Sequence, residues 1–131
     1  MVQKRGRVRI KRAYQQPEPS DGYRVLVDRL WARGVKKEQL KLDEWAKDLA
    51  PSTDLRKWFG HDPARWEEFG KRYKEELSSP ERREMLATLV DRSDQGPVTL
   101  VYGARDEEHN GAIVVTEVLN EMMERARRHA A

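Results

Sequence analysis

The sequence predicts an α/β protein with a small, mainly parallel sheet flanked by helices in three layers. Apolar segments of strand length alternate along the chain with segments whose apolar residues recur every three or four positions, the pattern of packed helices. The segment 97–104, "PVTLVYGA", is apolar nearly throughout, which is typical of a parallel strand buried on both faces. We expect a single domain over residues 1–131, with a basic, flexible arm at about 1–7.

Two further segments are expected to be strands. Residues 8–12, "VRIKR", alternate apolar and basic side chains, as does a strand with one solvated face. Residues 23–30, "YRVLVDRL", form the second apolar run, after a proline-rich loop at 15–22 that ends in Asp-Gly. Residues 41–52, "KLDEWAKDLAPS", fit a helix by the spacing of Trp45 and its neighbouring leucines, or a strand or extended arm closed by proline.

Capping residues predict where the helices begin. Ser52 can cap a short helix, and Asp62-Pro63 and Ser79-Pro80 each join an N-cap to a proline at the first helical position. A long helix follows the last strand, with arginines near its C-terminus, as the helix dipole favours. The apolar faces of the four helices are Leu55, Trp58 and Phe59; Trp66, Phe69, Tyr73 and Leu77; Met85, Leu86, Leu89 and Val90; and Ala112, Val115, Leu119, Met122 and Ala126.

The net charge of +3 conceals an uneven distribution. Residues 1–12 contain six lysines and arginines and no acid; removing these six from 26 leaves 20 basic against 23 acidic residues, a net charge of −3. We therefore do not expect the folded body to offer a basic nucleic-acid-binding surface. Only the first twelve residues and the C-terminal "RARRH" are cationic.

Several kinds of chemistry are excluded by composition and spacing. The absence of cysteine excludes disulfides, thiolate metal sites and a cysteine nucleophile. His61, His109 and His129 lack metal-ligand spacing, so no metal site is predicted, and no phosphate-loop or dinucleotide motif names a cofactor. With no run of about 18 apolar residues and no apolar leader, we expect a cytoplasmic protein without a membrane partner.

Residues 28–34, "DRLWARG", crowd opposite charges around an indole after the second expected strand. If the backbone stays extended, Arg29, Trp31 and Arg33 share one face, opposite the aspartate. The indole can then stack a planar group while the arginines hold an anion. The structural alternative is that Arg29 and Arg33 pair with helix carboxylates while Trp31 packs beneath them.

Two other segments carry candidate side chains. "YGARDEEHN", 102–110, precedes a helix N-terminus, where free N–H groups bind anions, and His109 there can exchange a proton near neutral pH. Its acids oppose an anion and can instead cap the helix. "RKWFGHDP", 56–63, contributes an arginine, a tryptophan and His61, which fits either a site or a structural cap.

The segments "IKRAY", "DGYRVLVDRLWARG", "LDEWAKDLAPSTDLRKWFGHDPARWEEF" and "VTLVYGARDEEHNGA" together resemble the YeaO-like branch of the domain-of-unknown-function family 488, over residues 8–121. The resemblance implies a compact α/β domain but brings no established biochemical activity. Its recurrent segments are the two strand ends and "APSTDLRKWFGH". They imply that the positions to test are Asp28, Arg29, Arg33, Arg56, Trp58, His61, Arg105, Asp106, His109 and Asn110.

Two departures from the family pattern bear on chemistry. Ala32 stands where relatives commonly carry proline, which implies a less rigid loop. A more distant branch carries cysteines and a His-Arg pair around the last strand end. Because Tyr102, Asn110, Gly111 and Ala112 occupy those places here, thiol chemistry does not carry over.

The leading hypothesis is a cytosolic domain with a polar strand-end pocket for a small anionic, phosphate- or nucleotide-like ligand, and as an enzyme it would be a hydrolase or transferase. One alternative is a nucleic-acid-associated module that uses the basic termini. Another is a small interaction protein without a catalytic pocket. The expected ligand contacts are Arg29, Trp31, Arg33, Arg56, Trp58, Arg105 and Asn110, and the catalytic candidates are Asp28, His61, Asp106 and His109.

Overall fold

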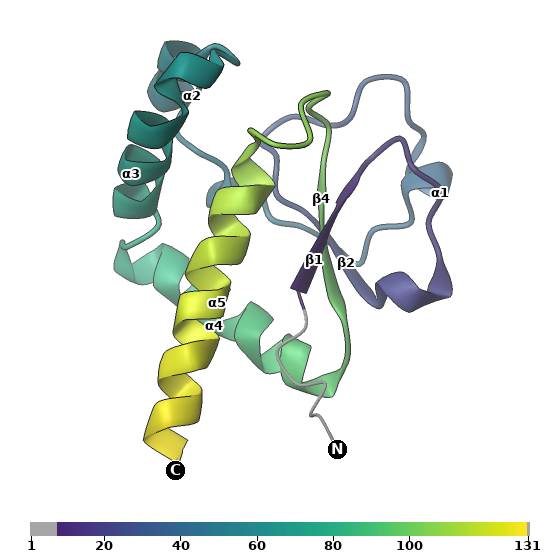
Figure 1. The fold of residues 1–131 in the computed structure, drawn as a ribbon. Helices are drawn as coiled ribbons and strands as arrows, with labels where there is room; N and C mark the ends of the chain where they lie inside the picture. Colours follow the sequence, from purple (N-terminus) through teal and green to yellow (C-terminus); the bar gives the residue numbers. More distant parts are fainter. Residues whose placement is uncertain (1–7, 131) are drawn as a thin grey trace.

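A computed structural model of the chain describes residues 8–130, and at its centre lies a four-stranded sheet (Figure 1). The strands are β1 (Val8–Arg12), β2 (Tyr23–Leu26), β3 (Glu44–Trp45) and β4 (Val98–Tyr102). They lie in the order β1-β4-β2-β3, and every neighbouring pair is parallel. The predicted α/β class and parallel sheet are confirmed. The arm predicted at about 1–7 lies outside the described residues.

Within the described range, five helices and three 3-10 turns connect or follow the strands. The helices are α1 (Lys37–Leu40), α2 (Thr53–Phe59), α3 (Trp66–Glu76), α4 (Pro80–Gln95) and α5 (Gly111–Ala130). The turns are η1 (Pro19–Asp21), η2 (Lys47–Leu49) and η3 (Pro63–Arg65). Among residues 8–130, no helix combines the length and the apolar character needed to cross a membrane.

The predicted helix caps are confirmed by hydrogen bonds. The side chains of Ser52, Asp62 and Ser79 each accept a backbone N–H from the turn that follows, at 3.2, 3.0 and 3.4 Å. Asp62 opens η3, which leads directly into α3, so the α-helix begins at Trp66, four residues after the capping residue. These caps satisfy backbone donors that the first turn of a helix leaves without partners.

The two faces of the sheet are covered unequally. Figure 1 shows α3, α4 and α5 gathered over one face, where Val25 and Leu100 join the larger core. On the opposite face Leu26 and Val101 pack against the segment 31–42, which includes α1. The sheet is therefore the middle of three layers, and one outer layer is a loop with a single helical turn.

The second strand ends earlier than its apolar run predicted. β2 stops at Leu26 instead of residue 30, although the Val27 N–H still donates to the Val101 carbonyl at 3.1 Å. The chain then bends, because the Asp28 side chain accepts a hydrogen bond from the loop after β4, and the Trp45 indole donates to the Asp28 carbonyl at 2.8 Å. The expected extended face of alternating side chains beyond Asp28 is therefore wrong. β4 likewise covers 98–102, less than the predicted 97–104.

The ambiguous segment 41–52 is a two-residue strand, β3, followed by the turn η2. In the part of the chain that the structure describes, β3 pairs only with β2 and lies at the edge of the sheet, so the strand alternative holds for the first part of the segment 41–52. The short α1 before it was not predicted. Four residues carry no helical period, and α1 takes its place by packing Leu40 against the sheet.

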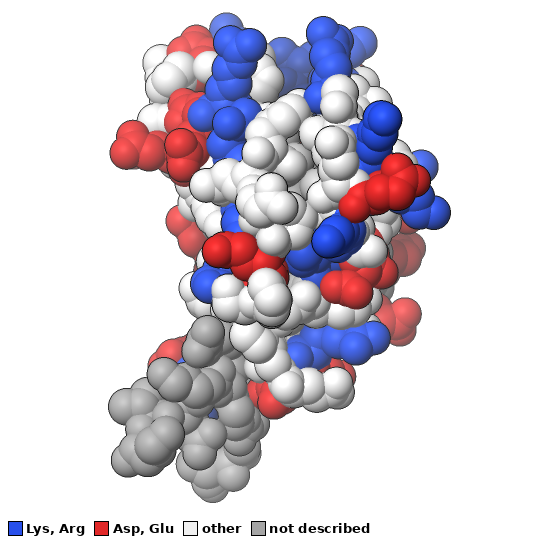
Figure 2. All heavy atoms as spheres, turned by 90° about the vertical axis from the view of Figure 1, so that its right-hand side faces the viewer, with Lys and Arg blue, Asp and Glu red and all other residues white. Residues whose placement is uncertain are grey.

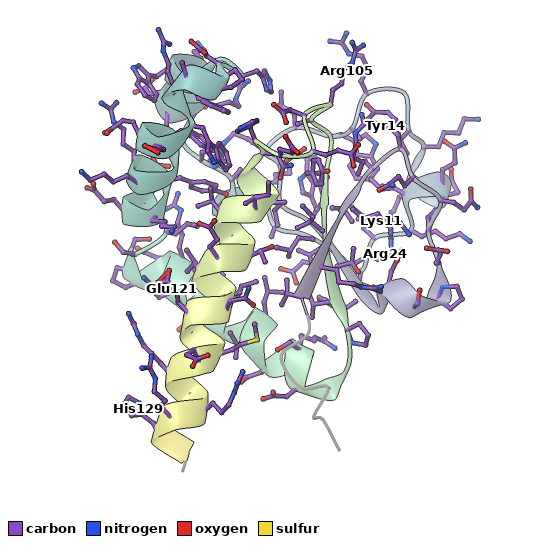
Figure 3. All side chains as sticks on the ribbon, viewed as in Figure 1. Lys11, Tyr14, Arg24, Arg105, Glu121 and His129 are labelled. Atoms are coloured by element: carbon purple, nitrogen blue, oxygen red, sulfur yellow. The ribbon has the colours of Figure 1, made fainter. Side chains whose placement is uncertain are left out.

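A buried ion pair ties the sheet to its thin outer layer. Arg24 on β2 donates to Asp21 Oδ2 at 2.7 Å, and both side chains are almost fully buried. Arg24 also donates to the Leu40 carbonyl of α1, at 2.8 and 3.1 Å, and Lys11 reaches Asp21 Oδ1 at 3.0 Å. Figure 3 shows Lys11 and Arg24 close together on this side of the sheet. The described half of the N-terminal basic segment is thus engaged in internal contacts.

Candidate functional site

A cleft of about 700 Å³, which we call the strand-end cleft, opens where β1, β2 and β4 end. Loops after these strands form its walls, together with residues of α2 and α3. Ligands of open parallel sheets usually bind at this end of the strands. The structure brings into the cleft ten of the eleven residues predicted as a site: Asp28, Arg29, Trp31, Arg33, Arg56, His61, Arg105, Asp106, His109 and Asn110.

Asp28 is half-buried in the strand-end cleft, and its carboxylate is held by the loop after β4. The Gly103 N–H donates to Oδ2 at 2.8 Å. A Cβ at Gly103 would lie 3.3 Å from that oxygen, so glycine permits the close approach. Burial raises the pKa of Asp28 above its usual value, against the opposing effects of the Gly103 N–H and of His61. The site therefore contains a carboxylate that is costly to keep charged.

Four arginines line the strand-end cleft without a partner for their charge among residues 8–130. Arg33, Arg56 and Arg105 are exposed, and Arg29 is half-buried. Their guanidinium groups form no ion pair or hydrogen bond with a residue in the described range, and the buried Nε of Arg29 has no acceptor there. Figure 3 shows Arg105 projecting beyond the end of the sheet. Unpaired guanidinium groups at one cleft favour an anionic ligand over a neutral one.

Trp31 stiffens the wall of the cleft and does not stack between guanidiniums. Its indole N–H donates to the Val35 carbonyl at 2.6 Å, and its ring meets that of Trp45 edge-on, with centroids 5.2 Å apart. Neither Arg29 nor Arg33 lies over the Trp31 ring among the cation–π contacts of the described residues. The packing alternative therefore holds for Trp31, while the pairing alternative for the two arginines does not.

The loop between β4 and α5 is organised by its own polar groups. Asp106 accepts the backbone N–H groups of Glu108 and His109 and lies 2.9 Å from Nδ1 of the His109 ring. The Glu108 N–H and the His109 side chain hold the pKa of Asp106 below its usual value. Asn110 is buried, and its side-chain oxygen accepts the Ile113 N–H at the start of α5. Asp106 thus caps only the turn before α5, and the helix itself is capped by Asn110 and not, as expected from the sequence, by one of the acids.

His61 and Trp58, both predicted from the α2 segment, end in different places. His61 is exposed and lines the cleft. Its own φ is 59°, a left-handed backbone conformation that is uncommon for residues other than glycine. Trp58 does not line the cleft. Its ring is covered by the guanidinium groups of Arg65 and Arg72, at 5.2 and 4.4 Å from its centroid. Of the two, only His61 joins the other predicted site residues.

Three features of the cleft were not predicted. Tyr14 follows β1, lines the cleft and donates from its hydroxyl to the Arg33 carbonyl at 2.9 Å. It is the last residue of "IKRAY", two residues after β1 ends, so the strand-end rule could have found it. Phe59 and Phe69 stack with centroids 4.2 Å apart and give the cleft an apolar wall. No sequence signal distinguishes these two from ordinary core residues, because their helical spacing is that of a packed face.

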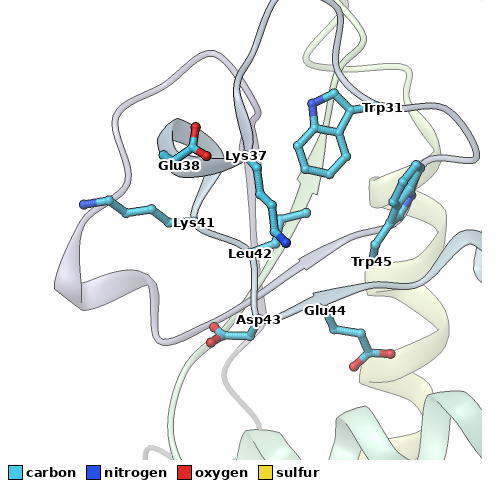
Figure 4. A pocket seen from close by; sticks show the side chains of 8 residues that line it. All are labelled: Trp31, Lys37, Glu38, Lys41, Leu42, Asp43, Glu44 and Trp45. Atoms are coloured by element: carbon cyan, nitrogen blue, oxygen red, sulfur yellow. The ribbon is translucent and has the colours of Figure 1, made fainter.

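A second, more open hollow lies beside β3 on the thin side of the sheet. Figure 4 shows Trp31 and Trp45 along one side of it and charged side chains along the other. Lysines and acids are mixed there, so the hollow favours neither sign of ligand charge. Its lining is Trp31, Lys37, Glu38, Lys41, Leu42, Asp43, Glu44 and Trp45. Trp31 thus separates this hollow from the strand-end cleft.

The surface charge agrees with the placement of the cleft. In Figure 2, Lys and Arg side chains are prominent at the top of the molecule, the end at which β1 and β4 finish in Figure 1. Lower on the same face, acidic and basic side chains are interspersed.

Fold and site together define a small parallel α/β protein with an arginine-lined cleft at its strand ends. The model of one family, DUF488-N3i, described as the inactive DUF488-N3 subclade, matches residues 7–131. The chain belongs to this family, which confirms the family that the sequence segments indicated.

Curated relatives match nearly the whole chain. The uncharacterized protein YeaO of Escherichia coli is 42% identical over 115 residues, which cover 88% of this chain and 98% of that protein. The uncharacterized protein Rv3073c of Mycobacterium tuberculosis is 42% identical over 114 residues, covering 87% of this chain and 94% of that protein. None of the solved structures matches this chain.

Proposed function

We propose that this protein binds a small anionic ligand, phosphate-bearing or nucleotide-like, in the strand-end cleft and does not transform it. The observation that supports the proposal most is that Arg29, Arg33, Arg56 and Arg105 line one cleft without an ionic partner in the described range. The helix α5 adds the positive end of its dipole where it begins at Gly111 in the same cleft.

Binding without turnover is proposed because the proton-transfer candidates are committed elsewhere or stand alone. Asp106 and His109 are bound to each other, and Asp106 caps the turn before α5. Asp28 has no histidine hydrogen-bonded to it within the described range, which a base acting with a relay would have. The matching family model is described as an inactive subclade, which agrees with this proposal.

The proposal is tested by calorimetric titration of the protein with inorganic phosphate and with AMP. We expect the double variant Arg29→Ala, Arg105→Ala to bind each at least tenfold more weakly, because a hydrogen bond to a charged group contributes about 1.5–3 kcal/mol. Arg127→Ala, Arg128→Ala, at the far end of α5, is the matched control and should bind as the wild type does. Equal affinity of the cleft variant and the wild type would contradict the proposal.

Turnover is tested separately with p-nitrophenyl phosphate and AMP. We expect no phosphate release above the rate without protein, even after prolonged incubation. Release that depends on Asp28 or His61, absent in the Asp28→Asn and His61→Ala variants, would instead support the hydrolase alternative.

The basic termini give weaker support to nucleic-acid binding. In the described half of the N-terminal segment, Lys11 pairs with Glu18 and Asp21, and the Arg12 Nε donates to the Ala104 carbonyl at 2.9 Å. Side chains already engaged within the protein have fewer donors left for phosphates. Because we place the ligand in the strand-end cleft and not at the termini, a variant in which Lys4, Arg5 and Arg7 become serine should bind AMP as the wild type does. A loss of AMP binding in this variant would shift support to the termini.

A further inference from the structure

We propose that the strand-end cleft selects phosphate-bearing ligands which also carry a hydroxyl or amine hydrogen-bond donor, and that Asp28 is the residue that recognises this donor. The inference rests on the proposed function and names the class of ligand more narrowly. Arginines at the mouth would hold the phosphate, and the carboxylate deeper in the cleft would accept the donor.

The hydrogen bonds of Asp28 leave room for such a donor. A carboxylate offers about four lone-pair sites. Within the described residues the Asp28 carboxylate accepts one hydrogen bond, from the Gly103 N–H to Oδ2, and it forms no ion pair, even though Arg29 is its neighbour in sequence. Because Asp28 lines the cleft, its remaining acceptor capacity is available to a ligand.

The surroundings of Asp28 make it costly to keep its carboxylate charged with only one hydrogen-bond donor. Phe59 and Phe69 supply apolar surface in the same cleft, and Asp28 itself is half-buried. A partly desolvated carboxylate with one hydrogen bond is destabilising until a further donor reaches it. The dianion of a simple alkyl phosphate has no hydrogen-bond donor and brings only negative charge near Asp28. A ligand with a hydroxyl or ammonium group supplies what the carboxylate lacks.

Asp28 is also held in place, which a residue that discriminates between ligands requires. The indole N–H of Trp45 donates to its carbonyl at 2.8 Å, and the Gly103 N–H fixes its side chain. The two bonds come from different elements, β3 and the loop after β4. A fixed acceptor distinguishes ligands by where their donor lies, because it does not move to meet a misplaced one.

The test compares O-phosphoethanolamine with ethyl phosphate, two probes of similar size that differ in a terminal ammonium group. In the wild type we expect phosphoethanolamine to bind at least tenfold more tightly. In Asp28→Asn this advantage should disappear, because the amide oxygen replaces the carboxylate at Gly103 and leaves an NH₂ group facing the ammonium. Ethyl phosphate should bind the variant as well as or better than the wild type.

The outcomes separate the two proposals. If ethyl phosphate binds and the Arg29→Ala, Arg105→Ala variant loses it, but phosphoethanolamine shows no advantage in the wild type, the present inference is overturned and the anion site stands. An advantage that survives in Asp28→Asn also overturns it. If neither probe binds, the anion site fails as well. Should Asp28→Asn not fold, the wild-type comparison is repeated at falling pH, where protonation of Asp28 should remove the advantage.

Discussion

Asp28 is a side chain whose charge lowers the stability of the folded protein. Its carboxylate is half-buried beside aromatic rings and is met by a single backbone N–H. Burial raises the pKa of Asp28, which means that the folded state favours its protonated form. A residue selected for stability alone would be neutral here, and residues that oppose stability are frequent in binding sites.

This cost predicts that Asp28→Asn stabilises the protein at about pH 7. The amide keeps an acceptor for the Gly103 N–H and removes a poorly solvated charge, so the free energy of unfolding should rise by on the order of 1 kcal/mol. Because the pKa of Asp28 is raised by folding, the contribution of Asp28 to wild-type stability falls as pH rises from the unfolded pKa, about 3.9, through the folded one.

The measurement is urea unfolding of both proteins at about pH 7 and about pH 3.5. The gain of the variant should be present at the higher pH and absent at the lower, where the wild-type side chain is protonated in both states. Destabilisation of the variant at neutral pH would mean that the charge of Asp28 is compensated within the protein.

Residue types at strand ends were enough to predict most of the charged side chains that line the cleft, but not what each of them does there. The charges of Arg29 and Arg105 lie where the sequence placed them. The packing of Trp31 on Trp45 depends on a residue that the fold brings near, and the sequence pattern gives no distance between such partners. The cap that Asn110 forms is local, to Ile113 three residues later, and was not predicted. Trp58, which was predicted from the segment 56–63 and not from a strand end, lies outside the cleft.

The helix α2 connects local capping to the geometry of the cleft. Ser52 Oγ accepts the Leu55 N–H, and Ser52 also binds Glu76 of α3 through its N–H and hydroxyl, at 2.8 and 2.6 Å. These bonds fix the start of the helix that carries Arg56 and leads to His61. Ser52 does not line the cleft, but its hydrogen bonds determine where Arg56 and His61 lie.

We predict that Ser52→Ala lowers the free energy of unfolding by about 1–2 kcal/mol, since it removes a helix cap and a contact to a carboxylate. It should also weaken AMP binding several-fold by loosening α2. Ser79→Ala removes the equivalent cap of α4 and serves as the control. For Ser79→Ala we expect a similar loss of stability and unchanged AMP binding. If the two variants bind AMP equally well, α2 does not position the site.

Elements with strong local signals were predicted well, and the others were not. Asp62-Pro63 and Ser79-Pro80 marked the helix starts because caps act within one turn. The end of β2 depends on a hydrogen bond to Gly103, 75 residues further along the chain. α1 and β3 are too short to show a period and are held by burial of Leu40 and Trp45 against the sheet.

Across the whole molecule, the thin layer over the sheet is secured by charge as well as by apolar packing. Arg24 connects Asp21 to the Leu40 carbonyl, so it links η1, β2 and α1. Burial works to raise the pKa of Asp21, but the Glu18 N–H, Lys11 and Arg24 outweigh it and hold that pKa below its usual value. The stabilisation this pairing gives should be present at neutral pH and lost as pH falls through the lowered pKa.

We predict that Arg24→Met lowers the free energy of unfolding by about 3 kcal/mol at neutral pH, because a buried carboxylate loses its closest cation. Urea unfolding measures the loss, and it should shrink in acid as Asp21 is protonated. Lys74→Met breaks an exposed pair with Glu117 and should cost less than about 1 kcal/mol. Equal losses in the two variants would rule out a structural role for the buried pair.

The most direct test of an anion site at the strand ends is a nuclear magnetic resonance titration of the ¹⁵N-labelled wild type with AMP. We predict that the backbone amide shifts concentrate at 28–33, 56–61 and 103–111, the segments around the strand-end cleft, and are absent in Arg29→Ala, Arg105→Ala. Shifts confined to the hollow beside β3 or to the C-terminal half of α5, or no shifts at all at millimolar AMP, would contradict it.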